Sequence, residues 1–232
     1  MTRKIKSYTI SLERGDGMKK SVYSLVLMDD IIQAIDTLAY SMNTSRSNLI
    51  NQILAEKVAV VTPEMHMQDV FGRMERLLNG YSNLQVQSQA SDTMISIRSV
   101  LRYKYNPTIR YAVNLYRGQE DYIGELKVIS RTQSGLLYEY LAHFFEMWAQ
   151  IEVQYHSKKW TIEQGAKWSR KLLNEEEKVY TPDEIAEAIS DYIKVLDEGL
   201  KIYFIQNSKN GESMAMLGEH YRTYHRQAKI KL

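Results

Sequence analysis

Two pairs of side chains have the chemistry of metal ligands or proton carriers, but their spacing does not favour a site. His143 and Glu146 lie three residues apart on one predicted helix and would offer a metal only two ligands. His220 and His225 are five residues apart and do not share a helical face. The acidic run at 175–177 is most simply the solvated end of a helix. The sequence also lacks a glycine-rich phosphate loop, a Gly-x-Ser-x-Gly and a His-Glu-x-x-His. We therefore predict no metal site, no cofactor and no enzymatic activity.

The composition is that of an ordinary globular protein. The 232 residues allow one or two domains, and 44% of them are hydrophobic while 25% are charged. Cysteine is absent, which excludes disulfides and cysteine-based zinc sites and favours a reducing cytoplasm. No run of about 18 apolar residues and no secretory signal occurs, so we expect no membrane span. The formal net charge is only +2, so a nucleic-acid-binding function must rest on local features.

The elements that would position functional residues begin near residue 20. Residues 20–28 alternate, with Tyr23, Leu25 and Leu27 on one face of a predicted strand. Residues 29–42 switch to a period of about 3.6 and predict a helix. Its apolar stripe consists of Ile31, Ile32, Ile35, Leu38, Ala39 and Met42. Thr44 or Ser45 can then cap a second helix. The apolar face of that helix consists of Leu49, Ile50, Ile53, Leu54 and Val58.

A strand and two short helices, roughly 40 residues in all, are too few to bury these faces in a monomer. A dimer solves the problem, because two strands can pair antiparallel above four helices. The pattern lies in the strand at 23–27, in the run from Ile31 to Ala39, and most specifically in Ser45-Arg46-Ser47-x-Leu49-Ile50. Residues from about Lys20 to Val60 therefore resemble the ribbon–helix–helix DNA-binding family, the Arc/MetJ/CopG-like repressors.

The resemblance implies a dimer that binds double-stranded DNA with its ribbon in the major groove. The outward strand positions would face the bases, and they are Lys20, Val22, Ser24 and Val26. The start of the second helix would hold a backbone phosphate, because free N–H groups and the helix dipole favour an anion there. The residues at that start are Ser45, Arg46 and Ser47. The basic N-terminal arm could add contacts through Arg3, Lys4 and Lys6.

Two outward strand positions depart from the family pattern, which usually has polar or basic residues there. Val22 and Val26 can touch thymine methyl groups but cannot form bidentate hydrogen bonds to bases. The module could therefore serve mainly to dimerise, as a protein-interaction module without the steep salt dependence of phosphate contacts. Single residues also have simpler interpretations: Ser45 as a helix cap, Arg46 as a solvated charge and Ser24 as an exposed serine.

We predict four segments along the chain. They are a basic arm at 1–19, the ribbon–helix–helix module at 20–60, a helix (63–79) and linker within 61–93, and a C-terminal domain at 94–232. In the C-terminal domain, strands are predicted at 94–105, 109–115 and 122–129, and helices at 132–156, 161–177 and 182–206. The last helix has a strong start signal, Thr181-Pro182-Asp183-Glu184. The predicted fold class is α+β, with the dimer module followed by a three-stranded antiparallel meander and several helices.

Basic residues and tyrosines are interleaved along the predicted meander. They are Arg98, Arg102, Lys104, Arg110, Arg117, Lys127 and Arg131 with Tyr103, Tyr105, Tyr111 and Tyr116. This could be a second nucleic-acid surface with bases stacked on the rings, or simply a half-exposed sheet. The stripe of Phe144, Phe145 and Trp148 is more typical of a core than of a ligand pocket. A small-molecule effector and a protein partner are both open for this domain.

The function predicted from these features is that of a transcriptional repressor, a homodimer or higher oligomer. It would act in the cytoplasm of a bacterium or archaeon and could be encoded by a plasmid or phage. The main alternative is a structural DNA-binding protein, such as a plasmid partition or relaxosome accessory factor. Such a protein would bind repeated sites through the ribbon and recruit a partner through its C-terminal domain.

Overall fold

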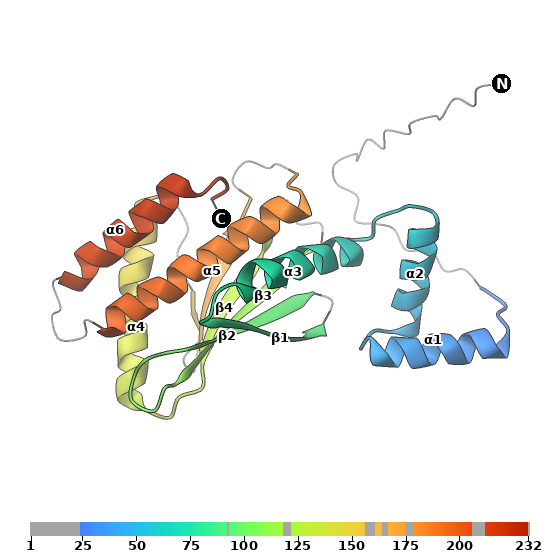
Figure 1. The fold of residues 1–232 in the computed structure, drawn as a ribbon, viewed down its shortest axis with the longest axis horizontal. Coiled ribbons are helices and arrows are strands. Elements are labelled where there is room, and N and C mark those ends of the chain that lie inside the picture. Colours follow the sequence, from blue (N-terminus) through green and yellow to red (C-terminus); the bar gives the residue numbers. More distant parts are fainter. Residues whose placement is uncertain are drawn as a thin grey trace, which may run out of the picture.

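The computed structural model describes residues 24–91, 93–117, 122–155, 161–163, 167–174, 179–205 and 212–231. The helices in these residues are α1 (Asp29–Ser41), α2 (Arg46–Lys57), α3 (Pro63–Asn79), α4 (Gly135–Glu152), α5 (Pro182–Ile205) and α6 (Glu212–Gln227) (Figure 1). The strands are β1 (Leu84–Ser91), β2 (Met94–Val100), β3 (Thr108–Leu115), β4 (Tyr122–Ser130), β5 (Thr161–Glu163) and β6 (Lys167–Leu173). None of the helices described is long and apolar enough to cross a membrane.

The strands form one antiparallel sheet of six strands in the order β1-β2-β3-β4-β6-β5. β1 to β4 follow one another as a meander, and β6 then pairs with the free side of β4 after α4 has intervened. Successive side chains of a strand point to opposite faces, so the alternating apolar residues of β3 gather on one face. These residues are Ile109, Tyr111, Val113 and Leu115, and all are buried.

Helices α3 to α6 cover the apolar face of the sheet. Tyr111 of β3 donates a hydrogen bond of 2.9 Å to Asp197 of α5. Phe145 of α4 stacks on Trp168 of β6 with 4.3 Å between ring centroids. α5 lies between α3 and α6, and α4 contacts α6 (Figure 1). In the part of the chain that the structure describes, these contacts define a core on one side of the sheet only.

The close packing of α4 on α5 depends on a glycine. A Cβ at Gly199 of α5 would lie 2.5 Å from an edge carbon of the Trp148 ring, which no real side chain tolerates. Glycine in a helix interior costs about 1 kcal/mol relative to alanine, and here it allows the indole of α4 to reach the backbone of α5. Trp148 is consequently fully buried.

A buried ionic cluster joins β6, α4 and α5. Arg170 of β6 donates from Nε to Glu152 of α4 over 3.1 Å, and the Glu152 side chain is 1% exposed. The Tyr192 hydroxyl of α5 also donates to Glu152, and the Arg170 guanidinium lies 4.5 Å from the centre of the Tyr192 ring. Burial raises the pKa of the Tyr192 hydroxyl well above its ordinary value, so it remains a hydrogen-bond donor.

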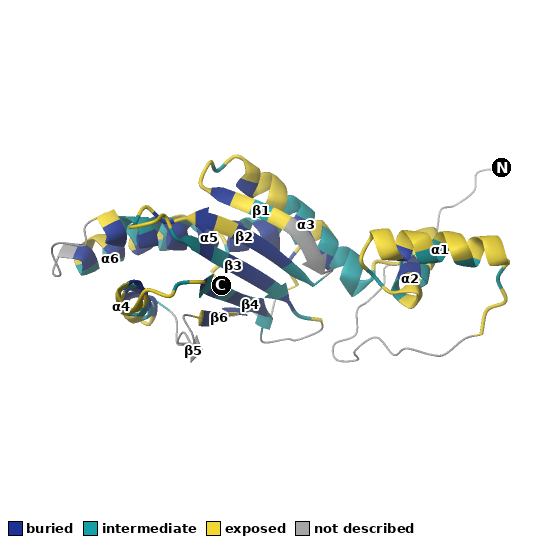
Figure 2. Cartoon of the chain, turned by 90° about the horizontal axis from the view of Figure 1, so that it is seen from below, coloured by how far each residue is buried: buried dark blue, intermediate teal, exposed yellow. Residues whose placement is uncertain are grey.

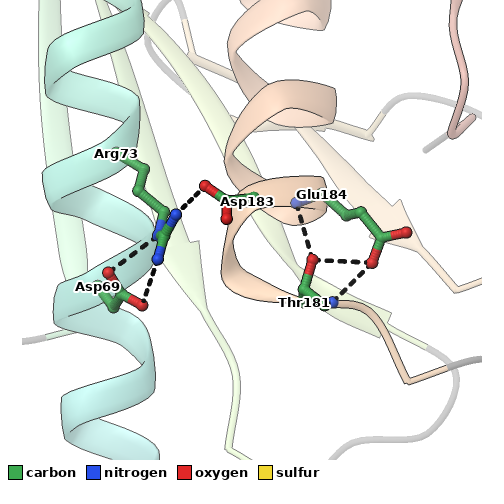
Figure 3. Close-up of polar contacts among 5 residues, drawn as sticks. All are labelled: Asp69, Arg73, Thr181, Asp183 and Glu184. Carbon is green, nitrogen blue, oxygen red and sulfur yellow. Dashed lines mark hydrogen bonds and ion pairs between the residues drawn. The ribbon is translucent and has the colours of Figure 1, made fainter.

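The predicted start of α5 is confirmed by a capping box (Figure 3). The Thr181 N–H donates to the Glu184 carboxylate over 2.8 Å, and the Glu184 N–H donates to Thr181 Oγ1 over 3.3 Å. Arg73 of α3 bridges the two helices, because it pairs with Asp69 on its own helix and with Asp183 in the first turn of α5. These contacts fix α3 beside α5.

The predicted three-stranded meander is wrong, because the sheet has six strands. β1 occupies part of the segment predicted as a linker, and α3 packs on β1 and α5 instead of joining two domains. The predicted helix at 161–177 is wrong, because Thr161–Glu163 and Lys167–Leu173 are the antiparallel strands β5 and β6. The core-facing residues of β6 are Trp168, Arg170 and Leu172, so a charged residue interrupts the apolar alternation that would have predicted a strand. The chain is α+β overall, but the architecture differs from the prediction.

Two predicted boundaries also move. β2 ends at Val100 instead of running to Tyr105, and Tyr105 (φ 67°) and Asn106 (φ 44°) lie in a turn in left-handed conformations. No helix is predicted beyond residue 206, but Glu212–Gln227 form α6. Leu217 and Tyr221 of α6 are fully buried, so this helix completes the core of the sheet domain, which we define as residues 63–231.

Candidate nucleic-acid interface

Helices α1 and α2 form a pair that projects from the sheet domain (Figure 1). Residues 58–62 join this α1–α2 pair to α3. The apolar core cluster of the protein begins at Met67 and contains no residue of either helix. The buried residues of the pair are Ala39, Leu49 and Ala55, which are few and mostly small. The pair therefore has only a minimal core of its own.

The turn between the two helices is well determined by local hydrogen bonds. α1 is followed by a left-handed residue, Asn43 (φ 50°), and the N–H of Thr44 donates to the carbonyl of Ala39 over 2.9 Å. Ser45 then caps α2, because its Oγ accepts a hydrogen bond of 3.2 Å from the N–H of Asn48. The two helices predicted at 29–42 and after Ser45, and the turn between them, are thus present. The first N–H groups of α2 have no intrahelical partners.

The apolar stripe predicted for the two helices is largely exposed. Ile31, Leu38 and Met42 of the α1 region are 39%, 46% and 44% exposed. Ile53, Leu54 and Val58 of the α2 region are 44%, 51% and 66% exposed. Figure 2 shows the same contrast, with the α1–α2 pair mostly yellow and the strands mostly dark blue. Single exposed apolar residues are ordinary, but exposed apolar residues that recur along each of two neighbouring helices are typical of an interaction surface.

The structure places the predicted phosphate ligands on one turn but gives two of them other partners. The Ser45 hydroxyl acts as the helix cap. Arg46 forms a bidentate ion pair with Asp36 of α1, through Nε to Oδ1 and Nη2 to Oδ2 at 2.5 Å each. The side chains of Arg46 and Asp36 are 57% and 44% exposed, so the pair is worth at most about 1 kcal/mol and can exchange for another anion. Ser47 is exposed.

The role of Asp36 was not foreseen from the sequence. It lies ten residues before Arg46, and this separation corresponds to no helical or strand period. Only the reversal of direction between α1 and α2 brings the two side chains together. Asp36 holds the guanidinium at the start of α2, and its negative charge also opposes any phosphate at the same place.

The predicted ribbon is only partly within the described residues. Residues 24–28 form no helix and no paired strand, while Lys20 and Val22 lie outside the described residues, as do Arg3, Lys4 and Lys6. Ser24 and Val26 are exposed, and Leu27 is half-buried. Met28, the last residue before α1, has extended backbone angles (φ −68°, ψ 146°).

The basic residues and tyrosines of the sheet do not share one surface. Tyr111 is fully buried on the helix-covered face, and Tyr103 packs edge-on against Phe204 of α5 with ring centroids 5.3 Å apart. The guanidinium of Arg110, next in sequence to Tyr111, instead lies on the opposite face and donates to Ser96 Oγ over 2.6 Å. The interpretation as a platform of interleaved cations and stacking rings is therefore wrong for these tyrosines.

The histidines considered as metal ligands take part in ordinary packing contacts. His143 Nδ1 lies 2.9 Å from the Tyr203 hydroxyl, and His220 Nε2 lies 3.0 Å from the Val195 carbonyl oxygen. Within the described ranges, no three His, Asp or Glu side chains gather as a metal site would require. Among the described residues, the exposed α1–α2 pair is therefore the candidate interaction surface.

Comparison with known proteins adds no relative. No protein-family model, no curated protein and no solved structure matches the chain.

Proposed function

We propose that this protein is a dimeric, sequence-specific DNA-binding protein of the ribbon–helix–helix type that acts as a transcriptional repressor. The observation that carries the proposal is the exposed apolar stripe of the α1–α2 pair, with Leu38, Leu54 and Val58 each at least 46% exposed. The sheet domain does not cover this stripe, and the buried residues of the pair are too few for an independent core.

A second copy of the chain is the partner that would cover this exposed apolar stripe. Homodimers usually form through one patch that is complementary to itself about a two-fold axis. Two α1–α2 pairs placed face to face would bury both stripes in one four-helix core. The segments before α1 would then lie next to each other, so that residues 24–28 of the two copies could pair as antiparallel strands.

Such a ribbon would present Ser24 and Val26 to the major groove, and both side chains are exposed in the monomer. The start of α2 would meet the DNA backbone. Its free N–H groups and the helix dipole attract a phosphate. The guanidinium of Arg46 would leave Asp36 and bind the phosphate oxygens instead. Specific contacts and phosphate contacts would thus come from neighbouring parts of one small module.

Selection of binding sites from a random DNA library by the purified full-length protein, at near-physiological salt, tests the proposal. We expect a dimer in solution and recovery of a short palindromic or repeated site. A single paired site upstream of a gene would support a repressor, whereas an array of repeats would support a partition or relaxosome accessory factor. If the protein is a dimer but selects no site, sequence-specific DNA binding is refuted, and the exposed apolar stripe is then a protein-interaction surface.

A second measurement separates specific DNA binding from nonspecific adhesion. Binding through phosphate contacts weakens steeply with salt, in proportion to the number of phosphates neutralised. Arg46→Ala should weaken binding to every duplex, while Ser24→Ala should mainly reduce the preference for the selected site. Equal effects of both variants on the selected site and on a random duplex would contradict these roles.

A further inference from the structure

The face of the sheet opposite the helices carries a row of basic residues. The strand register places Arg98 of β2 beside Arg110 of β3, then Ile129 of β4, then Lys167 of β6. Neighbouring strands are about 4.8 Å apart, so the row extends for roughly 14 Å across the sheet. Arg98 and Lys167 are exposed, and Arg110 is half-buried.

The cations of this row have no carboxylate partner among the residues that the structure describes. Arg98 donates to Thr108 Oγ1 over 3.3 Å and Arg110 donates to Ser96 Oγ over 2.6 Å, so hydroxyl groups orient both guanidinium groups without neutralising them. Elsewhere on the sheet, basic residues are paired: Lys127 with Glu125, and Arg117 with Glu64 of α3. The one acidic residue in register with the row is Glu163, opposite Lys167.

The Arg98–Arg110 pair is unfavourable for the isolated protein. Like charges directly opposite one another on neighbouring strands destabilise a sheet by a few tenths to about 1 kcal/mol. A chain that keeps such a pair, with both guanidinium groups held in place, has the arrangement expected of a site for an external anion.

A hollow at one end of the row adds a fourth basic side chain, Arg131. Arg110 and Lys167 line it together with Arg131, which follows β4, and the polar side chains of Ser130, Thr132 and Gln133 complete the lining with Ile129. Its volume is about 570 Å³ and it opens widely to solvent. Arg98 lies outside the hollow, so the basic surface continues beyond the space that a small anion would fill.

We infer that this surface, defined by Arg98, Arg110, Arg131 and Lys167, binds the phosphate backbone of duplex nucleic acid. A duplex carries one negative charge per about 1.7 Å of its axis, so a row roughly 14 Å long meets several phosphates at once. Single strands are bound through rings that stack on bases, but the row contains no aromatic residue. Tyr103 and Tyr111 are packed on the other side of the sheet, and the exposed Tyr105 belongs to the turn after β2. Ile129 is the one apolar residue within the row, so the row lacks the apolar centre that is typical of a protein interface.

This surface goes beyond the proposed function, because it adds a second, sequence-independent contact from a different part of the molecule. Binding of one duplex by both regions would raise affinity through effective concentration, without any new specific contact. The α1–α2 pair would select the site, and the sheet surface would hold the neighbouring backbone of the same or another duplex.

The test is the triple variant Arg98→Gln, Arg110→Gln and Lys167→Gln in the full-length protein. A matched control removes three basic residues from the helical side, Arg222→Gln, Arg226→Gln and Lys229→Gln, each of which is exposed and paired with a glutamate. Binding is measured from about 0.05 to 0.2 M salt on the selected duplex and on a random duplex of the same length. Inorganic phosphate and polyglutamate serve as competitors.

We expect the sheet variant to lose at least about tenfold in affinity for both duplexes, and its salt slope to fall by about 0.9 for each lost contact. The control should retain the slope. The melting temperature of the sheet variant should be equal or higher, since the Arg98–Arg110 repulsion is removed. Equal behaviour of the two triple variants would overturn the inference. So would release of the random duplex by inorganic phosphate alone at concentrations where polyglutamate has no effect, because that pattern indicates a small-anion site.

The two proposals can fail separately. If Arg46→Ala has no effect while the sheet variant binds weakly, the ribbon is wrong and the sheet surface stands. If Arg46→Ala weakens binding while the sheet variant matches the control, the sheet surface is wrong and the ribbon stands.

Discussion

In the sheet domain, Phe144, Trp148 and Leu196 are completely buried, whereas Leu38 and Leu54 of the α1–α2 pair are 46% and 51% exposed (Figure 2). Both regions have helices with regular apolar stripes, so helical periodicity alone does not distinguish them. The difference lies in what each stripe contacts. Helices α3 to α6 pack against a sheet of the same chain, whereas α1 and α2, among the described elements, pack chiefly on each other. An exposed stripe of this kind is the part of a fold that another chain must complete.

The ionic contacts of the two regions differ in the same way. Arg170 and Glu152 are 6% and 1% exposed, so neither charge can exchange its partner without leaving an uncompensated charge in the core. Arg46 and Asp36 are about half exposed and can separate at little cost. The buried pair is thus structural, and the exposed pair is suited to a contact that changes on binding.

Loss of the buried pair should have the largest effect. Glu152→Ala leaves the Arg170 guanidinium buried without its counter-ion, and we expect the sheet domain to lose about 3–5 kcal/mol of unfolding free energy. Denaturant unfolding measures the change. As a control, Glu219→Ala breaks exposed ion pairs to Arg222 and Arg226 and should cost less than about 1 kcal/mol. Similar losses in the two variants would remove the distinction between buried and exposed pairs.

The next effect tests whether the α1–α2 stripe is an interface. Leu38→Asp places a charge in the proposed dimer core, and we expect the dimer dissociation constant to rise at least about a hundredfold. Leu136→Asp, at a 53% exposed position in the first turn of α4, is the matched control and should leave the dimer intact. Sedimentation measures assembly, and DNA binding should fall with it. If Leu38→Asp remains a dimer, the two chains associate through another surface.

The two regions were predictable from the sequence to different degrees. α3, α4 and α5 follow regular stripes, and the Thr181-Pro182-Asp183-Glu184 signal located the start of α5 at Pro182. β6 was missed because Arg170 stands where an apolar residue would complete the alternation, and only the fold brings Glu152 to it. β1 was missed because Leu84 and Val86 are its only large apolar residues on the core face, within a polar segment.

The candidate sites show the limits of local patterns. The cap at Ser45 could be predicted because capping depends on neighbouring residues. The Asp36–Arg46 pair and the basic row could not, because they depend on how separate elements meet. Lys167 belongs to the row only because β6 is a strand. Strict application of strand alternation would have separated Arg110 from Tyr111, since adjacent residues of a strand point to opposite faces.

A smaller effect would sharpen the role of the exposed pair. Asp36→Asn removes the carboxylate that holds Arg46, so we expect DNA affinity to rise roughly threefold to tenfold while unfolding free energy falls by less than about 1 kcal/mol. Asp30→Asn removes the same charge from the first turn of α1 and is the matched control. An equal gain from both variants would show that the net charge of α1, and not the release of Arg46, sets the affinity.

The smallest expected effect concerns His66, which lies in the first turns of α3, close to the junction of the two regions. Burial lowers the pKa of His66 below its ordinary value of 6.5, although the nearby Asp69 carboxylate partly opposes this shift. The folded protein therefore binds the proton less readily than the unfolded chain does. The contribution of neutral His66 to stability is fully present above about pH 6.5 and is lost as the pH falls below it.

Chemical unfolding at a series of pH values tests this contribution of His66. As the pH falls below about 6.5, the unfolding free energy should decline less for His66→Gln than for the parent protein. The same pH range should leave the dimer dissociation constant unchanged if the α1–α2 pair is an independent interface. A parallel change in assembly would mean that the junction transmits the charge of His66 to the α1–α2 pair, and the two regions could then no longer be treated as separate.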